Sequence, residues 1–204
     1  MEKKKKGLVF VVSAPSGTGK TTLCRAMTRI FPGLYYSISY TTRQRRPGDE
    51  NDKDYHFISP QEFQQMIDRG EFVEWAEIYG HRYGTSRAVV KKVLEEGRDV
   101  ILDIDGQGAR QMRDKKLPGA FIFLLPPSLE ELQRRLSDRK TEGKAAMEER
   151  LRKAKVEMAE AHWYDYWIVN DELGKAQEQL QAVILAEHCR RVRMTGAIED
   201  LLSE

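Results

Sequence analysis

The residues with the clearest chemical potential form a glycine-rich segment near the start of the chain, at residues 14–21. This segment matches the phosphate-binding pattern G-x-x-x-x-G-K-[ST], except that Ala14 stands where the first glycine is usual. Its glycines let successive backbone N–H groups turn into one concavity, where they bind an oxyanion together with the start of the following helix. We therefore expect a nucleoside triphosphate site built from Ala14, Pro15, Ser16, Gly17, Thr18, Gly19, Lys20, Thr21 and Thr22.

A triphosphate site also needs ligands for Mg²⁺, and two parts of the sequence supply them. Lys20 reaches the β- and γ-phosphates, and the Thr21 hydroxyl can coordinate the ion. Assistance comes from Asp103 or Asp105, because the apolar run Val100–Leu102 places the acidic residues that follow it at the carboxyl edge of a sheet. Asp105 can instead cap the helix that follows it.

A third group of candidates is the arginine-rich segment at residues 42–48, which is followed by Tyr55. Arginine side chains bind a phosphate dianion through paired hydrogen bonds, and a tyrosine hydroxyl can add a neutral donor. An arginine cluster of this kind is more often a solvated loop or a nucleic-acid patch when it occurs alone. Together with the triphosphate loop, Arg43 and Arg46 favour a second, smaller phosphate ligand.

The composition disfavours several other classes of protein. The 204 residues include 34 Lys and Arg and 32 Asp and Glu, so the net charge of +2 provides no long-range field for a nucleic acid. Charged residues at 32% and hydrophobic residues at 40% are typical of a globular domain. Cys24 and Cys189 lack metal-binding spacing, which favours a reduced, cytoplasmic protein. The apolar runs are too short for a secretory signal or a membrane span.

The elements that must position these residues follow a βαβ pattern. Apolar runs without alternation predict strands buried on both faces, and helical patterns separate them. One helix covers Lys20–Ile30, and another carries Val89 to Leu94 and ends at Gly97. The sequence therefore predicts a parallel sheet covered by helices, with ligands at the carboxyl ends of the strands. The predicted strands are Leu8–Val12, Val100–Leu102, Ala120–Leu125 and Trp167–Val169.

Residues 34–85 depart from this alternation and predict a small inserted α+β subdomain. Short strands are expected at Ser37–Ser39 and Phe72–Tyr79. Between them, Ser59–Glu62 combines an N-cap, a proline and a capping-box glutamate, and opens a helix that turns Phe63 inward.

Residues 138–162 form a second departure. A short polar stretch lies here between a helix at Ser128–Leu136 and a long helix at about Ala145–His162. Because such a segment can open and close, we expect it to act as a lid. The core then comprises residues 1–33, 86–137 and 163–204.

Further motifs occur in order along nearly the whole chain, at Ser13–Thr21, Ser39–Arg43, Arg46–Gly48, Asp54–Phe57, Phe72–Ala76, Tyr83–Thr85, Ile101–Gly108, Pro126–Ser128 and Ile168–Asp171. In this order they resemble guanylate kinase. The resemblance implies a P-loop NTPase-type parallel sheet flanked by helices, with an inserted GMP-binding subdomain and a mobile lid. It also implies a cytoplasmic enzyme of purine metabolism that transfers the γ-phosphoryl group of MgATP to GMP.

By position, the resemblance implies roles for individual residues. The residues implied to bind the phosphate of GMP are Arg43, Arg46, Tyr55 and Tyr83, and those implied to contact guanine are Ser39, Glu74, Thr85 and Asp103. Catalytic roles fall to Lys20, Arg43, Arg139 and Arg150, with Arg135 a further candidate in the lid. Asn170 falls near the adenine of ATP, although an Asn-Asp pair at a strand end can also form a turn.

Glu74 has a chemical rationale as the residue that selects the base. Guanine presents N1–H and N2–H₂ as adjacent donors, and a carboxylate offers two matching acceptors, whereas adenine would place its unprotonated N1 against the charge. Unpaired buried polar groups of this kind give strong rejection of the wrong substrate. No general base is needed, because the acceptor is already an anionic phosphate oxygen.

Three other functions stay open on the sequence. A non-catalytic guanylate-kinase-like interaction module would lack the donor loop, whereas Gly19, Lys20 and Thr21 are present. A kinase of the same fold acting on a phosphorylated sugar would not need Glu74 or Ser39. Nucleic-acid binding through the arginine segment would depend steeply on salt. The sequence does not distinguish a monomer from a homo-oligomer, and it has Lys140 where the family usually has a glycine in the lid.

Overall fold

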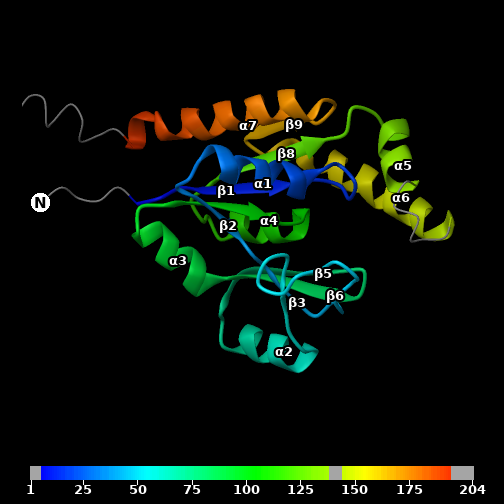
Figure 1. Cartoon of the computed structure of the whole chain (residues 1–204), viewed down its shortest axis with the longest axis horizontal. Coiled ribbons are helices and arrows are strands. Elements are labelled where there is room, and N and C mark those ends of the chain that lie inside the picture. Colours follow the sequence, from blue (N-terminus) through cyan, green and yellow to red (C-terminus); the bar gives the residue numbers. More distant parts are fainter. Residues whose placement is uncertain (1–5, 138–143, 194–204) are drawn as a thin grey trace, which may run out of the picture.

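The computed structural model describes residues 6–137 and 144–193, which form two sheets and the helices around them (Figure 1). The larger sheet has five parallel strands in the order β2-β7-β1-β8-β9. The strands are β1 (Val9–Ser13), β2 (Leu34–Ser37), β7 (Asp99–Asp103), β8 (Ala120–Leu125) and β9 (Tyr166–Val169). The predicted parallel α/β architecture is confirmed.

Helices cover both faces of this sheet because β1 sends alternate side chains to opposite sides. Phe10 and Val12 pack in one apolar cluster with α1 (Lys20–Ile30) and α7 (Leu173–His188). Val9 and Val11 pack in the other cluster, which contains residues of two further helices. These are α3 (Arg87–Glu95) and α4 (Gly106–Asp114), with the short 3₁₀ turn Ala161–Trp163 beside them. The helix predicted at Lys20–Ile30 and the helix predicted to carry Val89 to Leu94 are therefore confirmed, and Gly97, expected to end the second, has positive φ after α3.

The second sheet has four strands in the order β4-β3-β6-β5 and lies beside α2 (Figure 1). Its long hairpin is made by β5 and β6, and Phe63 of α2 stacks on Phe72 at the start of β5. Gln111 of α4 donates to the carbonyl oxygen of Trp75, which ties the hairpin to the core. The elements are β3 (Tyr40–Thr41), β4 (His56–Phe57), α2 (Pro60–Asp68), β5 (Phe72–Ile78) and β6 (His81–Ser86).

The remaining helices stand at one end of the molecule (Figure 1). They are α5 (Leu129–Ser137) and α6 (Lys144–Ala159), which pack together through Leu132, Leu136 and Ala154. A further 3₁₀ turn at Arg191–Arg193 follows α7. No helix in the described ranges is both long and apolar enough to cross a membrane.

Two sequence predictions about strands were wrong. The strand expected at Ser37–Ser39 is β2, which runs from Leu34 to Ser37 and pairs with β7 in the large sheet. The strand at Trp167–Val169 was expected to be buried on both faces. It is an edge strand with one exposed face: Trp167 is 59% and Val169 is 47% exposed, whereas Ile168 points to the opposite face and is buried. Apolar content alone does not distinguish an edge strand from a central one.

The capping box at the start of α2 gives a prediction about stability. Ser59 Oγ accepts from the Glu62 backbone N–H, and the Glu62 carboxylate accepts from the Ser59 N–H at 2.8 Å. We expect Ser59→Ala to lower the free energy of unfolding by about 1 kcal/mol. Urea unfolding followed by circular dichroism measures this loss, and Ser59→Asp serves as the control that keeps a cap. Equal midpoints for wild type and Ser59→Ala would contradict the role of the box.

Candidate functional site

A cavity of about 300 Å³ lies where the large sheet, the hairpin of the second sheet and α6 meet. Its wall contains the loop after β1, the end of β7, and residues from β5, β6 and α6. The cavity therefore opens at the carboxyl edge of the parallel strands, where the sequence predicts a ligand. Most of the predicted site residues line it, namely Ala14, Pro15, Ser16, Gly17, Gly19, Lys20, Thr21, Thr22, Ser39, Arg46, Tyr55, Glu74, Tyr83, Asp103, Asp105 and Arg150.

The loop between β1 and α1 has the backbone of an anion cradle. Gly17 and Gly19 have φ of 90° and 92°, a conformation that other residues rarely adopt, whereas Ala14 is not among the residues with positive φ. Alanine at the first position of the motif thus causes no backbone strain. Gly19 is the N-cap of α1 and has no side chain to accept from its first N–H groups. Those donors are available to an oxyanion.

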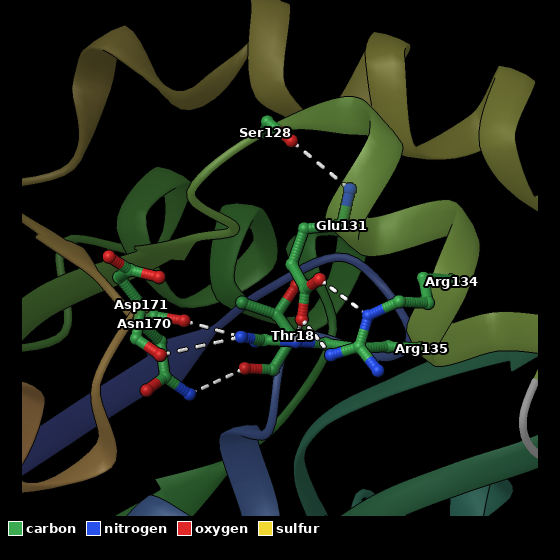
Figure 2. A network of polar contacts seen from close by, with 7 residues as sticks. All are labelled: Thr18, Ser128, Glu131, Arg134, Arg135, Asn170 and Asp171. Carbon is green, nitrogen blue, oxygen red and sulfur yellow. Dashed lines mark hydrogen bonds and ion pairs between the residues drawn. The ribbon is translucent and has the colours of Figure 1, made fainter.

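Asn170, which was expected near adenine, contacts the phosphate loop through its side chain (Figure 2). Its side-chain amide is buried and donates to the carbonyl oxygen of Thr18 at 2.6 Å. Arg135 of α5 donates in turn to the carbonyl oxygen of Asn170 at 3.0 Å, while Glu131 accepts from Arg135 Nε at 2.7 Å. The end of β9 and helix α5 thereby fix the shape of the loop. Neither Asn170 nor Thr18 lines the cavity.

Lys20, Thr21 and Asp103 form a compact polar cluster at the ends of β1 and β7. The Lys20 Nζ lies 3.0 Å from Asp103 Oδ1, and the Thr21 hydroxyl donates to Asp103 Oδ2 at 2.6 Å. Tyr36, at the end of β2, donates to the same oxygen at 3.0 Å and was not expected from the sequence. Burial alone would raise the pKa of Asp103, but Lys20 and these hydrogen bonds hold it below its usual value.

Lys20 stays protonated in this setting. Burial by itself would lower its pKa, but the Asp103 carboxylate outweighs this and raises the pKa of Lys20 to about 12. A fixed positive charge therefore stands at the end of the loop at every physiological pH. Its Nζ also donates to the carbonyl oxygen of Ile104 at 2.5 Å.

Asp105 caps helix α4, as the second interpretation of this residue predicts, and it uses only one of its two carboxylate oxygens to do so. Its Oδ1 accepts from the Gly108 backbone N–H at 2.9 Å and caps α4. Its Oδ2 is buried and has no hydrogen-bond partner among the atoms of the described residues. A buried oxygen without a donor is rare, so this atom is available to a cation or to a bound water.

Glu74 lies on β5 with its carboxylate in the wall of the cavity and is only 3% exposed. Thr85 on β6 donates to its Oε1 at 2.5 Å. Burial raises the pKa of Glu74 to about 7, against the opposing effect of the Thr85 hydrogen bond. A Cβ atom at position 108 would lie 2.1 Å from Glu74 Oε2, so α4 can approach this carboxylate only because residue 108 is glycine.

Of the four residues predicted to bind the second phosphate, three line the cavity. Arg46, Tyr55 and Tyr83 line the cavity, whereas Arg43 does not. Arg43 is buried beside it, with its Nη1 2.9 Å from Asp49 Oδ2 and its guanidinium 5.3 Å from the centre of the Tyr55 ring. Arg43 therefore has to move before it can contact a ligand in the cavity.

Helix α6 adds residues that sequence reasoning missed. Lys153 and Glu157 line the cavity together with Arg150, and their spacing of three and seven residues from Arg150 places all three on one face of the helix. That periodicity could have identified them. Ala76, Ile78, Tyr79 and Ile104 complete the lining. Arg139, the other predicted lid arginine, and Lys140 lie outside the described residues.

The pKa of Glu74 gives a prediction with a definite sign. Its folded value of about 7 lies above the ordinary 4.5, so the folded protein holds this proton more tightly and loses stability as pH rises between the two values. We therefore compare the free energy of unfolding of wild type with that of Glu74→Gln. The difference, wild type minus variant, should fall by on the order of a few kcal/mol from about pH 5 to about pH 8.

Denaturant titrations of the ligand-free protein over this range measure the difference. Glu77→Gln, at an exposed position three residues further along the same strand, should keep the wild-type pH dependence. A constant difference between wild type and Glu74→Gln would contradict the raised pKa.

Comparisons with known proteins agree with this geometry. A family model described as guanylate kinase matches residues 6–187. The guanylate kinase of Geobacter sulfurreducens is 49% identical over 200 residues and covers 98% of both chains. That of Symbiobacterium thermophilum is 46% identical over 204 residues, covering 100% of this chain and 97% of its own.

A solved structure extends the similarity to three dimensions. The crystal structure of guanylate kinase from Anaplasma phagocytophilum matches with a TM-score of 0.80 at 33% identity, covering 98% of this chain and 96% of its own. The similarity spans both sheets and the helices around the cavity rather than the phosphate loop alone. The chain therefore belongs to the guanylate kinase family, as the order of its motifs indicates.

Proposed function

We propose residue roles for this ATP:GMP phosphotransferase, which transfers the γ-phosphoryl group of ATP to GMP and yields ADP and GDP. The observation that carries the assignment of roles is a buried carboxylate, Glu74, facing a complete phosphate loop across one cavity. A purine with adjacent hydrogen-bond donors suits the Glu74 carboxylate, and a triphosphate suits the phosphate loop. The two substrates can then meet between them.

On the donor side, the loop and Lys20 bind the phosphates of ATP. The N–H groups at the start of α1 and the Lys20 ammonium direct positive charge into the same end of the cavity. Asn170 and Arg135 keep the loop in shape through the Thr18 carbonyl, so they are positioning residues in this reaction.

Mg²⁺ fits the oxygen atoms at this end of the cavity. Thr21 contributes a hydroxyl, Asp103 a carboxylate and Asp105 a buried oxygen without a hydrogen-bond donor. The described residues contain no group of three His, Cys, Asp or Glu side chains that could hold a metal, so the ion depends on phosphate oxygens as well. When bound, it neutralises charge on the phosphates.

On the acceptor side, Glu74 recognises guanine. Its two oxygens accept from N1–H and N2–H₂, while Thr85 orients the carboxylate and Ser39 and Asp103 complete the polar wall. Since burial raises the pKa of Glu74 to about 7, the donors of guanine favour its ionised form on binding. Adenine offers no such donors to this charge and is rejected.

The acceptor phosphate lies toward Arg46, Tyr55 and Tyr83. Arg43 stacks on Tyr55 and joins this group when it exchanges Asp49 for the phosphate. Arg150, on the opposite wall, stabilises charge on the group in transit, and Arg139 acts with it as the lid closes. The remaining work is alignment, so no side chain has to act as a general base.

The alternatives weighed on the sequence are not favoured. The donor loop of this chain is complete, unlike that of an interaction module, and Glu74 and Ser39 both line the cavity, which a sugar phosphate would not require. We also propose that the division into core, GMP-binding subdomain and lid describes the moving parts, and that the protein acts in the cytoplasm without nucleic-acid partners.

The base assignment predicts how Glu74→Ala behaves. We expect wild type to prefer GMP over AMP by roughly a hundredfold or more in kcat/KM, and the variant to lose most of its GMP activity. ADP release with ATP and Mg²⁺, coupled to a spectroscopic readout, measures both acceptors. Glu77→Ala on the same strand should behave as wild type. Equal turnover of GMP and AMP by wild type would refute the assignment.

The donor assignment predicts the effect of Lys20→Met. This change keeps most of the buried volume and removes the charge, so transfer should fall by roughly a thousandfold with GMP as acceptor. The same ADP assay measures the loss, and circular dichroism checks that the variant is folded. Lys91→Met, on the surface of α3, is the matched control. Activity of Lys20→Met within a few fold of wild type would exclude the proposed role.

A further inference from the structure

The turn that joins β5 to β6 has an unusual residue at its tip. Ile78 pairs with His81, so Tyr79 and Gly80 form a two-residue turn, with φ of 51° and 77°. Two positive φ values define a type I′ turn, which favours Asn, Asp or Gly at its first central position. Tyrosine holds this backbone conformation at a cost, and the turn itself gives no reason for an aromatic ring there.

The ring of Tyr79 contacts two cations of α6. The Arg150 Cζ lies 5.1 Å and the Lys153 Nζ 4.9 Å from its centre, both within the range of cation–π attraction. Arg150 and Lys153 are three residues apart on one helix face, so a single ring serves both. Tyr79 is 50% exposed and still lines the cavity with these two side chains.

Arg150 extends this contact to the phosphate loop. Its Nη1 donates to Ser16 Oγ at 3.2 Å. One guanidinium therefore connects the acceptor-side hairpin, through Tyr79, to the donor loop, through Ser16. All three residues of this connection, Ser16, Tyr79 and Arg150, line the cavity.

We propose that Tyr79 is a positioning residue, whose ring holds Arg150 and Lys153 over the phosphate loop while the second sheet carries the acceptor. The inference rests on the proposed function, since that function gives Arg150 its role in phosphoryl transfer. It extends that function by linking the position of α6 to the hairpin that carries Glu74. This role explains why tyrosine occupies a strained turn position: the strain is the energetic cost of placing an aromatic ring next to Arg150 and Lys153.

Tyr79→Asn and Tyr79→Phe separate this role from a merely structural one. Asparagine suits the turn and removes the ring, so the variant should fold with a Tm at or above that of wild type. We expect its kcat with ATP and GMP to fall roughly fivefold to tenfold, and its KM for GMP to change less than about twofold, because the guanine contacts stay. Phenylalanine keeps the ring face and should stay within about twofold of wild type. Glu77→Gln is the control on the same hairpin.

A second measurement does not depend on activity. Hydrogen exchange of the backbone amides of α6 in the nucleotide-free protein should be faster in Tyr79→Asn and unchanged in Tyr79→Phe and Glu77→Gln. Wild-type exchange and wild-type kcat in Tyr79→Asn would overturn the inference and leave the proposed function intact. Equal losses of kcat in the Asn and Phe variants would also overturn it. If wild type fails to phosphorylate GMP, the proposed function falls, and the exchange rates still decide whether the ring holds α6.

Discussion

The half-buried ion pair between Lys20 and Asp103 depends on two parallel strands that end side by side. Val12 of β1 is in register with Asp103 of β7, so the loop after one strand and the last side chain of the other emerge together. The pair offsets the cost of burying either charge alone, and loss of one partner would leave the other uncompensated. The rest of the site is arranged around it. Thr21 and Tyr36 share the carboxylate, and two residues further Asp105 starts α4, the helix that supports the acceptor side.

The two sheets contribute different chemical groups to one cavity. The large sheet contributes the phosphate loop with its backbone donors, the Lys20 ammonium, and the carboxylates of Asp103 and Asp105. The second sheet contributes Glu74, a carboxylate whose pKa burial raises, and the segment between β3 and β4 carries Arg46 and Tyr55. Under the roles proposed above, the insertion of this second sheet between β2 and α3 gives each substrate its own surroundings within a single cavity.

The parts of the molecule that could be predicted from sequence are those set by local pattern. The phosphate loop, the central strands and the capping box of α2 each depend on neighbouring residues, and the structure has them where the pattern indicates. Long-range partners were not predictable. Sequence does not show that Asn170 contacts Thr18, that Asp49 holds Arg43, or that Tyr36 reaches Asp103, since each contact depends on how distant segments pack. Edge strand β9 was misjudged for the same reason: its apolar residues match those of a central strand, and only the packing of distant segments leaves the face that carries Trp167 and Val169 exposed.

The close approach of α4 to β5 gives a residue outside the cavity control over a residue in its wall. A side chain at position 108 has no room beside the Glu74 carboxylate where it lies, so residue 108 controls the position of Glu74 without itself lining the cavity. Substitution there requires the carboxylate to turn away, a shorter side chain at 74, or a shift of α4. A shift of α4 would also move Asp105, which caps the same helix and lines the cavity. Under the proposed roles, a change at residue 108 would therefore alter guanine recognition without changing any side chain of the cavity lining.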